Sequence, residues 1–197
     1  KAEALHYFPM WRTWFGLNGL CKLPWNDVEP ADKRTRYNGM DAAKVPEHVQ
    51  NYVELFRGVT GRTDIETGED LVRMSEVVYN FQRLFNLKMG YGTREHDAIP
   101  YRSMGPVTDV EYESRVERYD QQLRELVGVD PSGMSTEQKR LAFRRYREDQ
   151  YEKLIDAVYE RRGWDENGIP TLSNAQAMDI DFAEVIALIE NHTNWHQ

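Results

Sequence analysis

The residue whose type most clearly suggests chemistry in this sequence is Cys21, the only cysteine of the chain. A thiolate in a dry aromatic setting suits a soft metal such as iron in an iron–sulfur cluster. Such clusters usually take four thiolates, so a larger protein would have to supply the other ligands. Composition alone favours the alternative, an ordinary buried cysteine, because free cysteine is among the most buried residue types. The aromatic neighbours of Cys21 in the sequence are Tyr7, Phe8, Trp11, Trp14, Phe15 and Trp25.

The other reactive side chains form no pattern that identifies a catalytic site, and no catalytic residue is assigned. We find no glycine-rich phosphate loop, no serine-nucleophile elbow and no paired-carboxylate signature. Without further cysteines a zinc site is not expected. The histidines that lack metal-ligand spacing are His6, His48, His192 and His196.

Composition narrows the classes of function. The 25 basic residues are interleaved with 33 acidic ones, giving a net charge of −8, and no basic stripe suggests nucleic acid. No apolar run approaches the ~20 residues that cross a bilayer. A single cysteine excludes an internal disulfide framework and fits a reducing compartment, so we expect a cytoplasmic protein. The start Lys1-Ala2-Glu3 has no signal-peptide pattern and suggests a cut from a longer polypeptide or a processed product.

The elements that must position Cys21 are predicted to be helices, because apolar residues recur at helical spacing and no convincing alternating strand is found. Serine or threonine with an acidic or glutamine residue three positions later predicts helix starts at Thr67, Thr108 and Ser135. Glycines predict the corresponding ends at Gly90, Gly128 and Gly163. Two shorter helices are expected at 47–57 and 182–190.

The remaining segments are predicted to be loops and turns. Residues 26–46 form a long polar loop, 91–107 a loop with several helix breakers, and 165–170 a turn. The very polar stretch 144–150 is expected to be a solvated helix face, with a break as an alternative. The fold class is therefore all-α: an irregular multi-helix domain, part of a larger multidomain enzyme.

Three stretches together resemble the C-terminal domain of the tungsten-containing aldehyde:ferredoxin oxidoreductase family. The first is Gly19-Leu20-Cys21, similar to the glycine-leucine-cysteine motif of the family. The second is the helix and loop of residues 78–100, which contain Asn80, Arg83 and Asn86, then Arg94-Glu95-His96-Asp97. The third is residues 159–171, close to the ending typical of these enzymes. Their order and spacing across residues 16–171 make the match specific.

The resemblance implies specific roles for the first motif. Cys21 would join three cysteines of an earlier domain as a ligand of one [4Fe–4S] cluster. The backbone of Gly19 and Leu20 would lie against one pterin of a tungsten (or molybdenum) bis-pyranopterin. The family aspartate that bonds the pterin is Gly16 here, so Asn18 is the candidate substitute. Three departures from the family pattern suggest a divergent branch with an insertion at about 128–150. They are this Gly16, the pair His96-Asp97 in the later loop, and the longer segments 26–46 and 128–150.

The second motif has two interpretations. Asn80, Arg83 and Asn86 could reach the cofactor, but structural hydrogen bonds are the favoured interpretation, because buried polar groups must be paired. Residues 94–97 could line a substrate or partner channel, although a catalytic role for them is the less favoured view.

We therefore expect residues 1–197 to be a C-terminal cofactor- and cluster-binding domain, inactive as an isolated chain. The whole enzyme would oxidise an aldehyde to a carboxylic acid. Its partners would be N-terminal domains of the same enzyme, a small-molecule substrate, and ferredoxin or an electron-transfer subunit, with a homo-oligomer also allowed. The alternatives are a same-family reductase of an aromatic thioester and a cofactor-free helical interaction module.

Overall fold

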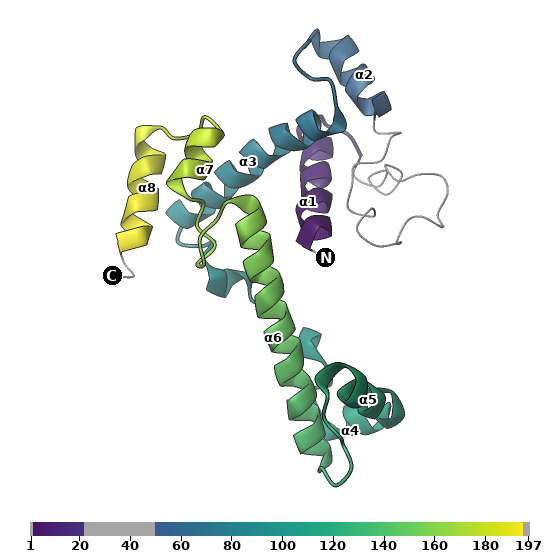
Figure 1. Cartoon of the computed structure of the whole chain (residues 1–197). Helices are drawn as coiled ribbons and strands as arrows, with labels where there is room; N and C mark the ends of the chain where they lie inside the picture. Colours follow the sequence, from purple (N-terminus) through teal and green to yellow (C-terminus); the bar gives the residue numbers. More distant parts are fainter. Residues whose placement is uncertain (1, 22–49, 195–197) are drawn as a thin grey trace. The chain divides into compact units, whose positions relative to one another are not determined.

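The computed structural model describes residues 2–21 and 50–194 (Figure 1). Among these residues the prediction of an all-α fold is confirmed, because the ordered elements are helices and the only β-type pairing is an isolated bridge between Trp164 and Pro170. The predicted loop at 26–46 lies outside the described residues. The chain divides into two compact units: Asp97–Asp156 forms unit 2, and the segments before and after it form unit 1.

Unit 1 has a first core where α1 (Ala2–Leu17) packs on α3 (Gly68–Lys88) and α2 (Gln50–Thr60) joins them. Aromatic rings dominate it, and Trp14 makes edge contacts with its neighbours Trp11, Phe15 and Tyr52. No helix was predicted from the sequence over α1. The segment contains Pro9, which is unfavourable inside a helix, and many aromatic residues. The buried members are Met10, Trp11, Trp14, Phe15, Val53, Ile65, Leu71 and Val72.

A second core of unit 1 joins the other half of α3 to α7 (Leu172–Ala177) and α8 (Ala183–Asn194). The last helix was predicted at 182–190 and is longer in the structure. The start predicted at Thr67 is confirmed: its side chain caps the Asp70 N–H, and the Asp70 carboxylate accepts from the Thr67 N–H. The buried members of this core are Leu84, Leu87, Ile169, Ala175, Met178, Ile180, Val185 and Ile189.

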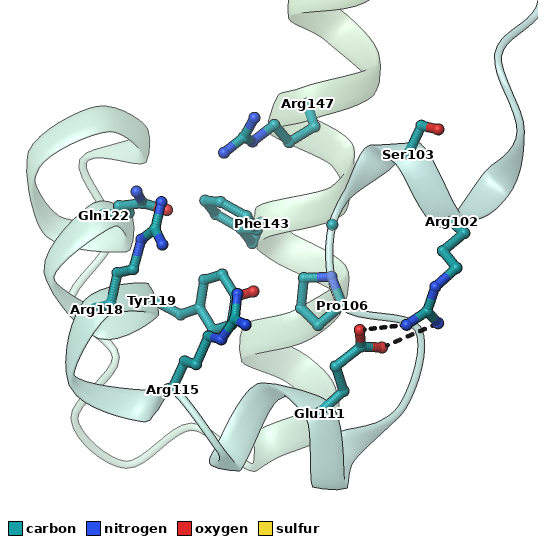
Figure 2. A pocket seen from close by; sticks show the side chains of 11 residues that line it. Arg102, Ser103, Pro106, Glu111, Arg115, Arg118, Tyr119, Gln122, Phe143 and Arg147 are labelled. Carbon is teal, nitrogen blue, oxygen red and sulfur yellow. Dashed lines mark hydrogen bonds and ion pairs between the residues drawn. The ribbon is translucent and has the colours of Figure 1, made fainter.

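Unit 2 contains η5 (Tyr101–Met104), α4 (Asp109–Glu113), α5 (Val116–Gln122), a π-helical turn η6 (Leu123–Val127) and most of α6 (Thr136–Arg162). The prediction of one helix from Thr108 to Gly128 is wrong, because Arg115 leaves the helical region at φ −140° and ψ 33°. Across this break the ring of Tyr112 packs against that of Tyr119. The Tyr119 ring in turn contacts Phe143 of α6 (Figure 2). The segment from Thr108 to Gly128 has a helical sequence pattern, but it is interrupted where these rings pack together.

The predicted solvated face or break at 144–150 is wrong for Arg144, which is 4% exposed in an unbroken α6. Its Nη1 donates to the Tyr101 carbonyl at 2.8 Å, and its guanidinium carbon lies 3.4 Å from the centroid of the Tyr101 ring. Glu148 lies one turn along the helix, 3.7 Å from Nη1. The arginine is buried because a carbonyl, a ring and a carboxylate replace the water that it loses.

Candidate functional site

The turn that carries Asn18, Gly19, Leu20 and Cys21 directly follows α1. The Leu20 N–H donates to the Phe15 carbonyl at 2.9 Å and the Gly19 N–H to the Gly16 carbonyl at 3.3 Å, which is the Schellman pattern. Gly19 has φ +68°, a left-handed conformation that glycine adopts without steric cost. The Asn18 amide adds a hydrogen bond of 2.8 Å from Nδ2 to the Trp14 carbonyl. The glycine therefore ends the helix and directs Leu20 and Cys21 away from it.

Cys21 is exposed, and this differs from both interpretations of its surroundings. The buried packing thiol does not hold, and the dry aromatic setting is also wrong for the thiol itself. Trp14 and Phe15 are 2% and 1% exposed because they form the core beneath α1. Trp11 and Trp14 are structural residues of this core, while Trp25 lies outside the described residues.

The donor chemistry of this turn fits one ligand position of an iron–sulfur cluster. An exposed thiol can reach a metal held partly by another domain, and thiolate is the usual ligand of such clusters. A Cβ added at Gly19 would meet no atom within 4 Å, so the main chain there is open to a flat ligand. Among residues 2–21 and 50–194 no three His, Cys, Asp or Glu side chains are grouped as metal ligands. The remaining thiolates of a cluster would have to come from outside this sequence, which has one cysteine.

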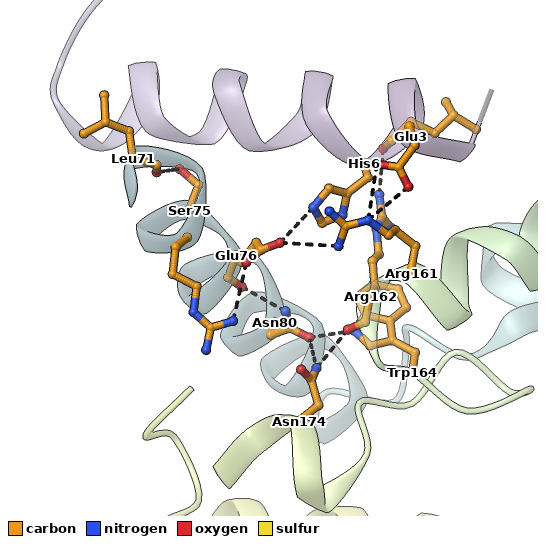
Figure 3. A network of polar contacts seen from close by, with 12 residues as sticks. Glu3, His6, Leu71, Ser75, Glu76, Asn80, Arg161, Arg162, Trp164 and Asn174 are labelled. Atoms are coloured by element: carbon orange, nitrogen blue, oxygen red, sulfur yellow. Dashed lines mark hydrogen bonds and ion pairs between the residues drawn. The ribbon is translucent and has the colours of Figure 1, made fainter. Parts of the chain in front are cut away.

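A buried polar network joins α1 to α3 and to the end of α6 within unit 1 (Figure 3). His6 is 1% exposed, and its Nε2 lies 2.8 Å from Oε1 of Glu76. Arg161 reaches both helices, with Nε 3.0 Å from Glu3 Oε1 and Nη1 4.0 Å from Glu76 Oε1. Arg73 approaches the other Glu76 oxygen at 3.5 Å.

These neighbours decide the charge of Glu76. Burial alone would raise its pKa, but the hydrogen bond and electrostatic interaction with His6 and the positive charges of Arg73 and Arg161 outweigh burial and bring the pKa below its ordinary value. Glu76 is therefore ionised at neutral pH in the folded protein. The network fixes the orientation of α1, and α1 in turn carries the turn with Cys21.

Asn80 continues the network into the C-terminal part of unit 1 (Figure 3). Its Oδ1 accepts hydrogen bonds from Trp164 Nε1 at 2.6 Å and from Asn174 Nδ2 at 3.0 Å. Its Nδ2 donates to the Glu76 carbonyl at 2.9 Å. With 2% of its surface exposed, Asn80 has the structural role that was favoured from the sequence.

Arg83 and Arg94 both fasten the turn predicted at residues 165–170. Arg83 Nε donates to the Gly168 carbonyl at 2.8 Å, and its guanidinium lies 4.6 Å from the centroid of the Trp164 ring. Arg94 bonds the same turn twice, from its N–H to the Asn167 carbonyl and from Nη1 to the Glu166 carbonyl. The structural interpretation is thus confirmed for Arg83 also.

The rest of the second motif joins no site with Cys21 in the described contacts. Asn86 is exposed, and its carbonyl accepts from the Tyr91 N–H at the end of α3. His96 packs locally, with Nδ1 2.7 Å from Thr93 Oγ1 and its ring against Tyr91, while Glu95 is exposed. The channel suggested for residues 94–97 stays a prediction.

A cavity of about 330 Å³ adjoins the network and is lined by His6, Met10, Glu76, Asn80, Arg161 and Met178, among others. The contacts of Glu76 with His6 and Arg161 were not predicted from the sequence. One signal was present: His6, Met10 and Trp14 recur every four residues, which places His6 on the buried face of α1.

Comparison with known families decides the identity of the chain. A family model described as aldehyde ferredoxin oxidoreductase, domains 2 and 3, matches residues 1–180. The chain belongs to the aldehyde ferredoxin oxidoreductase family. Neither the curated proteins nor the solved structures gave a significant match. The family resemblance of the three motifs is thereby confirmed.

Membership of the aldehyde ferredoxin oxidoreductase family makes the chain part of an oxidoreductase, and a match to domains 2 and 3 implies further domains of the same enzyme. No helix among residues 2–21 and 50–194 is long and apolar enough to cross a membrane. The contribution of this chain to such an enzyme is a helical scaffold with an exposed thiol at the end of α1.

Proposed function

We propose that this chain is the C-terminal cofactor- and cluster-binding part of a tungsten (or molybdenum) bis-pyranopterin oxidoreductase. The observation that carries the proposal is the exposed Cys21 thiol on a glycine-terminated turn, in a chain of the aldehyde ferredoxin oxidoreductase family. The whole enzyme oxidises an aldehyde to a carboxylic acid and passes the electrons to ferredoxin or an electron-transfer subunit. A cytoplasmic location fits the single free thiol.

In this proposal the chain binds and orients the iron–sulfur cluster and the metal–pterin cofactor, and these two groups supply the redox chemistry. The Cys21 Sγ binds one iron of a [4Fe–4S] cluster, and the N-terminal domains of the enzyme provide the other thiolates. The main chain at Gly19 and Leu20 lies against a pterin, because nothing in the described structure covers the open side of Gly19. Asn18 is the candidate that bonds the pterin. It also supports the turn, because its Nδ2 donates a hydrogen bond to the Trp14 carbonyl.

The test is Cys21→Ser in the intact enzyme, with iron content and the low-temperature magnetic resonance signal of the reduced cluster as readouts. We expect the iron content to fall or the signal to change, because serine removes the thiolate ligand. Folding should change by less than about 0.5 kcal/mol, because an exposed side chain away from caps and networks contributes little. The matched control is Leu17→Ala, an exposed change near the end of the same helix.

Two results would argue against the proposal. Unchanged iron and an unchanged cluster signal in Cys21→Ser would show that Cys21 is no ligand. Intact enzyme that contains no iron and neither tungsten nor molybdenum, in stoichiometric metal analysis, would favour the cofactor-free interaction module instead.

A further inference from the structure

Unit 2 has a cavity of about 230 Å³ that the proposed function does not use (Figure 2). Its apolar wall consists of the Tyr119 and Phe143 rings and Pro106. Arginine side chains from two helical segments surround these rings, with Arg115 and Arg118 on the α5 side and Arg147 on α6. The cavity lies below the 300–1,000 Å³ of typical ligand pockets, so it has room only for a small molecule.

The charge of this cavity is not balanced by the protein. The one carboxylate that lines it, Glu111, already accepts from Arg102 Nη2 at 2.8 Å and from the Val107 N–H at 3.0 Å. Within the described residues, no carboxylate oxygen lies within 4 Å of Arg115, Arg118 or Arg147.

The other basic residues of unit 2 make the contrast clear. Arg140 pairs with Asp109 and Lys139 with Asp120, each at 2.8 Å. Arg115, Arg118 and Arg147 therefore bring to the cavity three positive charges without a carboxylate partner among the described residues, in a chain whose net charge is −8.

Gln122 provides a second, independent observation. Its Oε1 is buried without a hydrogen-bond partner among the described residues, and the side chain lines the same cavity. A buried polar atom without a partner is rare and calls for an explanation such as a bound group. A glutamine amide can present either its oxygen or its NH₂ by rotating through a half-turn, so it can serve a donor or an acceptor of a ligand.

The local backbone brings these groups to one side. Arg118 and Gln122 are four residues apart, which places them on one face of α5, and Arg115 is the N-cap residue directly before this helix. The π-helical turn begins at the next residue, Leu123, and such turns occur frequently at functional sites. Arg147 completes the ring of charge from α6, and its guanidinium carbon lies 4.8 Å from the centroid of the Phe143 ring.

We propose that this cavity binds a small polyanion whose phosphate or carboxylate groups pair with Arg115, Arg118 and Arg147. The planar, always charged guanidinium suits both kinds of oxyanion. The ligand lies against the Tyr119 and Phe143 rings, and the Gln122 amide bonds one of its polar groups. The proposal concerns unit 2 alone and does not depend on a cluster or a pterin.

The test is calorimetric titration of the full-length protein with citrate, pyrophosphate and acetate at constant ionic strength. Citrate and pyrophosphate separate carboxylate from phosphate recognition, and acetate measures the effect of a single charge. We expect one equivalent of citrate or pyrophosphate to bind, with acetate at least about tenfold weaker. Arg118→Gln and Arg147→Gln should each weaken binding about tenfold or more, as expected for loss of a charge-assisted hydrogen bond.

The matched control is Arg145→Gln, an exposed arginine of α6 that also lacks an ion pair among the described residues but does not line the cavity. It should change affinity by less than about twofold, because a solvated charge outside the site is screened. Equal losses in Arg145→Gln and Arg118→Gln would overturn the proposal in favour of diffuse surface charge. A further titration uses polyglutamate, an acidic polypeptide. The proposal would also be overturned if citrate and pyrophosphate bound no more tightly than acetate and only polyglutamate bound.

Discussion

Replacing Asn80 by alanine should destabilise unit 1 by about 2–4 kcal/mol. The substitution removes the acceptor of the buried Trp164 indole N–H, and leaving such a donor unpaired costs about 1–3 kcal/mol. Asn174 loses one hydrogen bond, worth roughly 0.5–1.5 kcal/mol, but keeps its bond to the Arg162 carbonyl. The sum is a large change because Asn80 is 2% exposed and its Oδ1 accepts both hydrogen bonds from side chains inside unit 1.

The measurement is thermal and denaturant unfolding of the protein, followed by circular dichroism. For a chain of this size each kcal/mol lowers Tm by about 2–4 °C, so Asn80→Ala should lower it by roughly 4–16 °C. The control is Gln82→Ala, which removes an amide from an exposed position of the same helix. It should stay within about 0.5 kcal/mol of the unmodified protein.

A double-mutant cycle with Trp164→Phe isolates the hydrogen bond itself. The phenylalanine removes the indole donor, so the two substitutions should be non-additive by about 1 kcal/mol or more. The reasoning is refuted if Asn80→Ala unfolds like Gln82→Ala, or if Asn80→Ala and Trp164→Phe add within about 0.5 kcal/mol.

Two further predictions concern acid stability and backbone conformation. Glu76 has a folded pKa below its ordinary value of 4.5, so its contribution to stability is complete above that value and is lost as pH falls through the folded pKa. Glu76→Gln should therefore flatten the loss of stability that urea titrations detect from about pH 5 downward, and equal pH profiles for both proteins would contradict the role of the Glu76 contacts with His6, Arg73 and Arg161. Gly163→Ala and Gly61→Ala face the same backbone strain, with φ +69° and +70°, but only at Gly163 would a Cβ meet the side chain of Asn174, at 2.8 Å from Cγ. Gly61→Ala should cost about 1–2 kcal/mol and Gly163→Ala about 1–3 kcal/mol more in denaturant unfolding, and equal costs would refute the steric argument.

Local patterns in the sequence were sufficient for much of the fold. The capping pair Thr67 and Asp70 begins α3 as predicted, and Ser135 and Gln138 exchange the two hydrogen bonds of a capping box before α6. The helix ends at Gly90, Gly128 and Gly163 each have the positive φ expected of a glycine stop. These features could be predicted because each depends on a few neighbouring residues. The family motifs are likewise short segments, and the match over residues 1–180 confirms what they indicated.

Tertiary structure alone decided how distant residues pair. The partners Arg83 and Gly168, or His6 and Glu76, lie far apart in the sequence and are not implied by spacing. Arg144 lies in a stretch whose polar composition is typical of a solvated helix face. It is nevertheless buried, because folding brings the Tyr101 carbonyl and ring to its guanidinium. The type of Cys21 suggested a ligand from the sequence, whereas its exposure follows from the folded turn at Gly19, which directs it away from the core beneath α1. Side-chain type is a local property, but burial and pairing depend on every element that packs nearby, and so they emerge only in the folded chain.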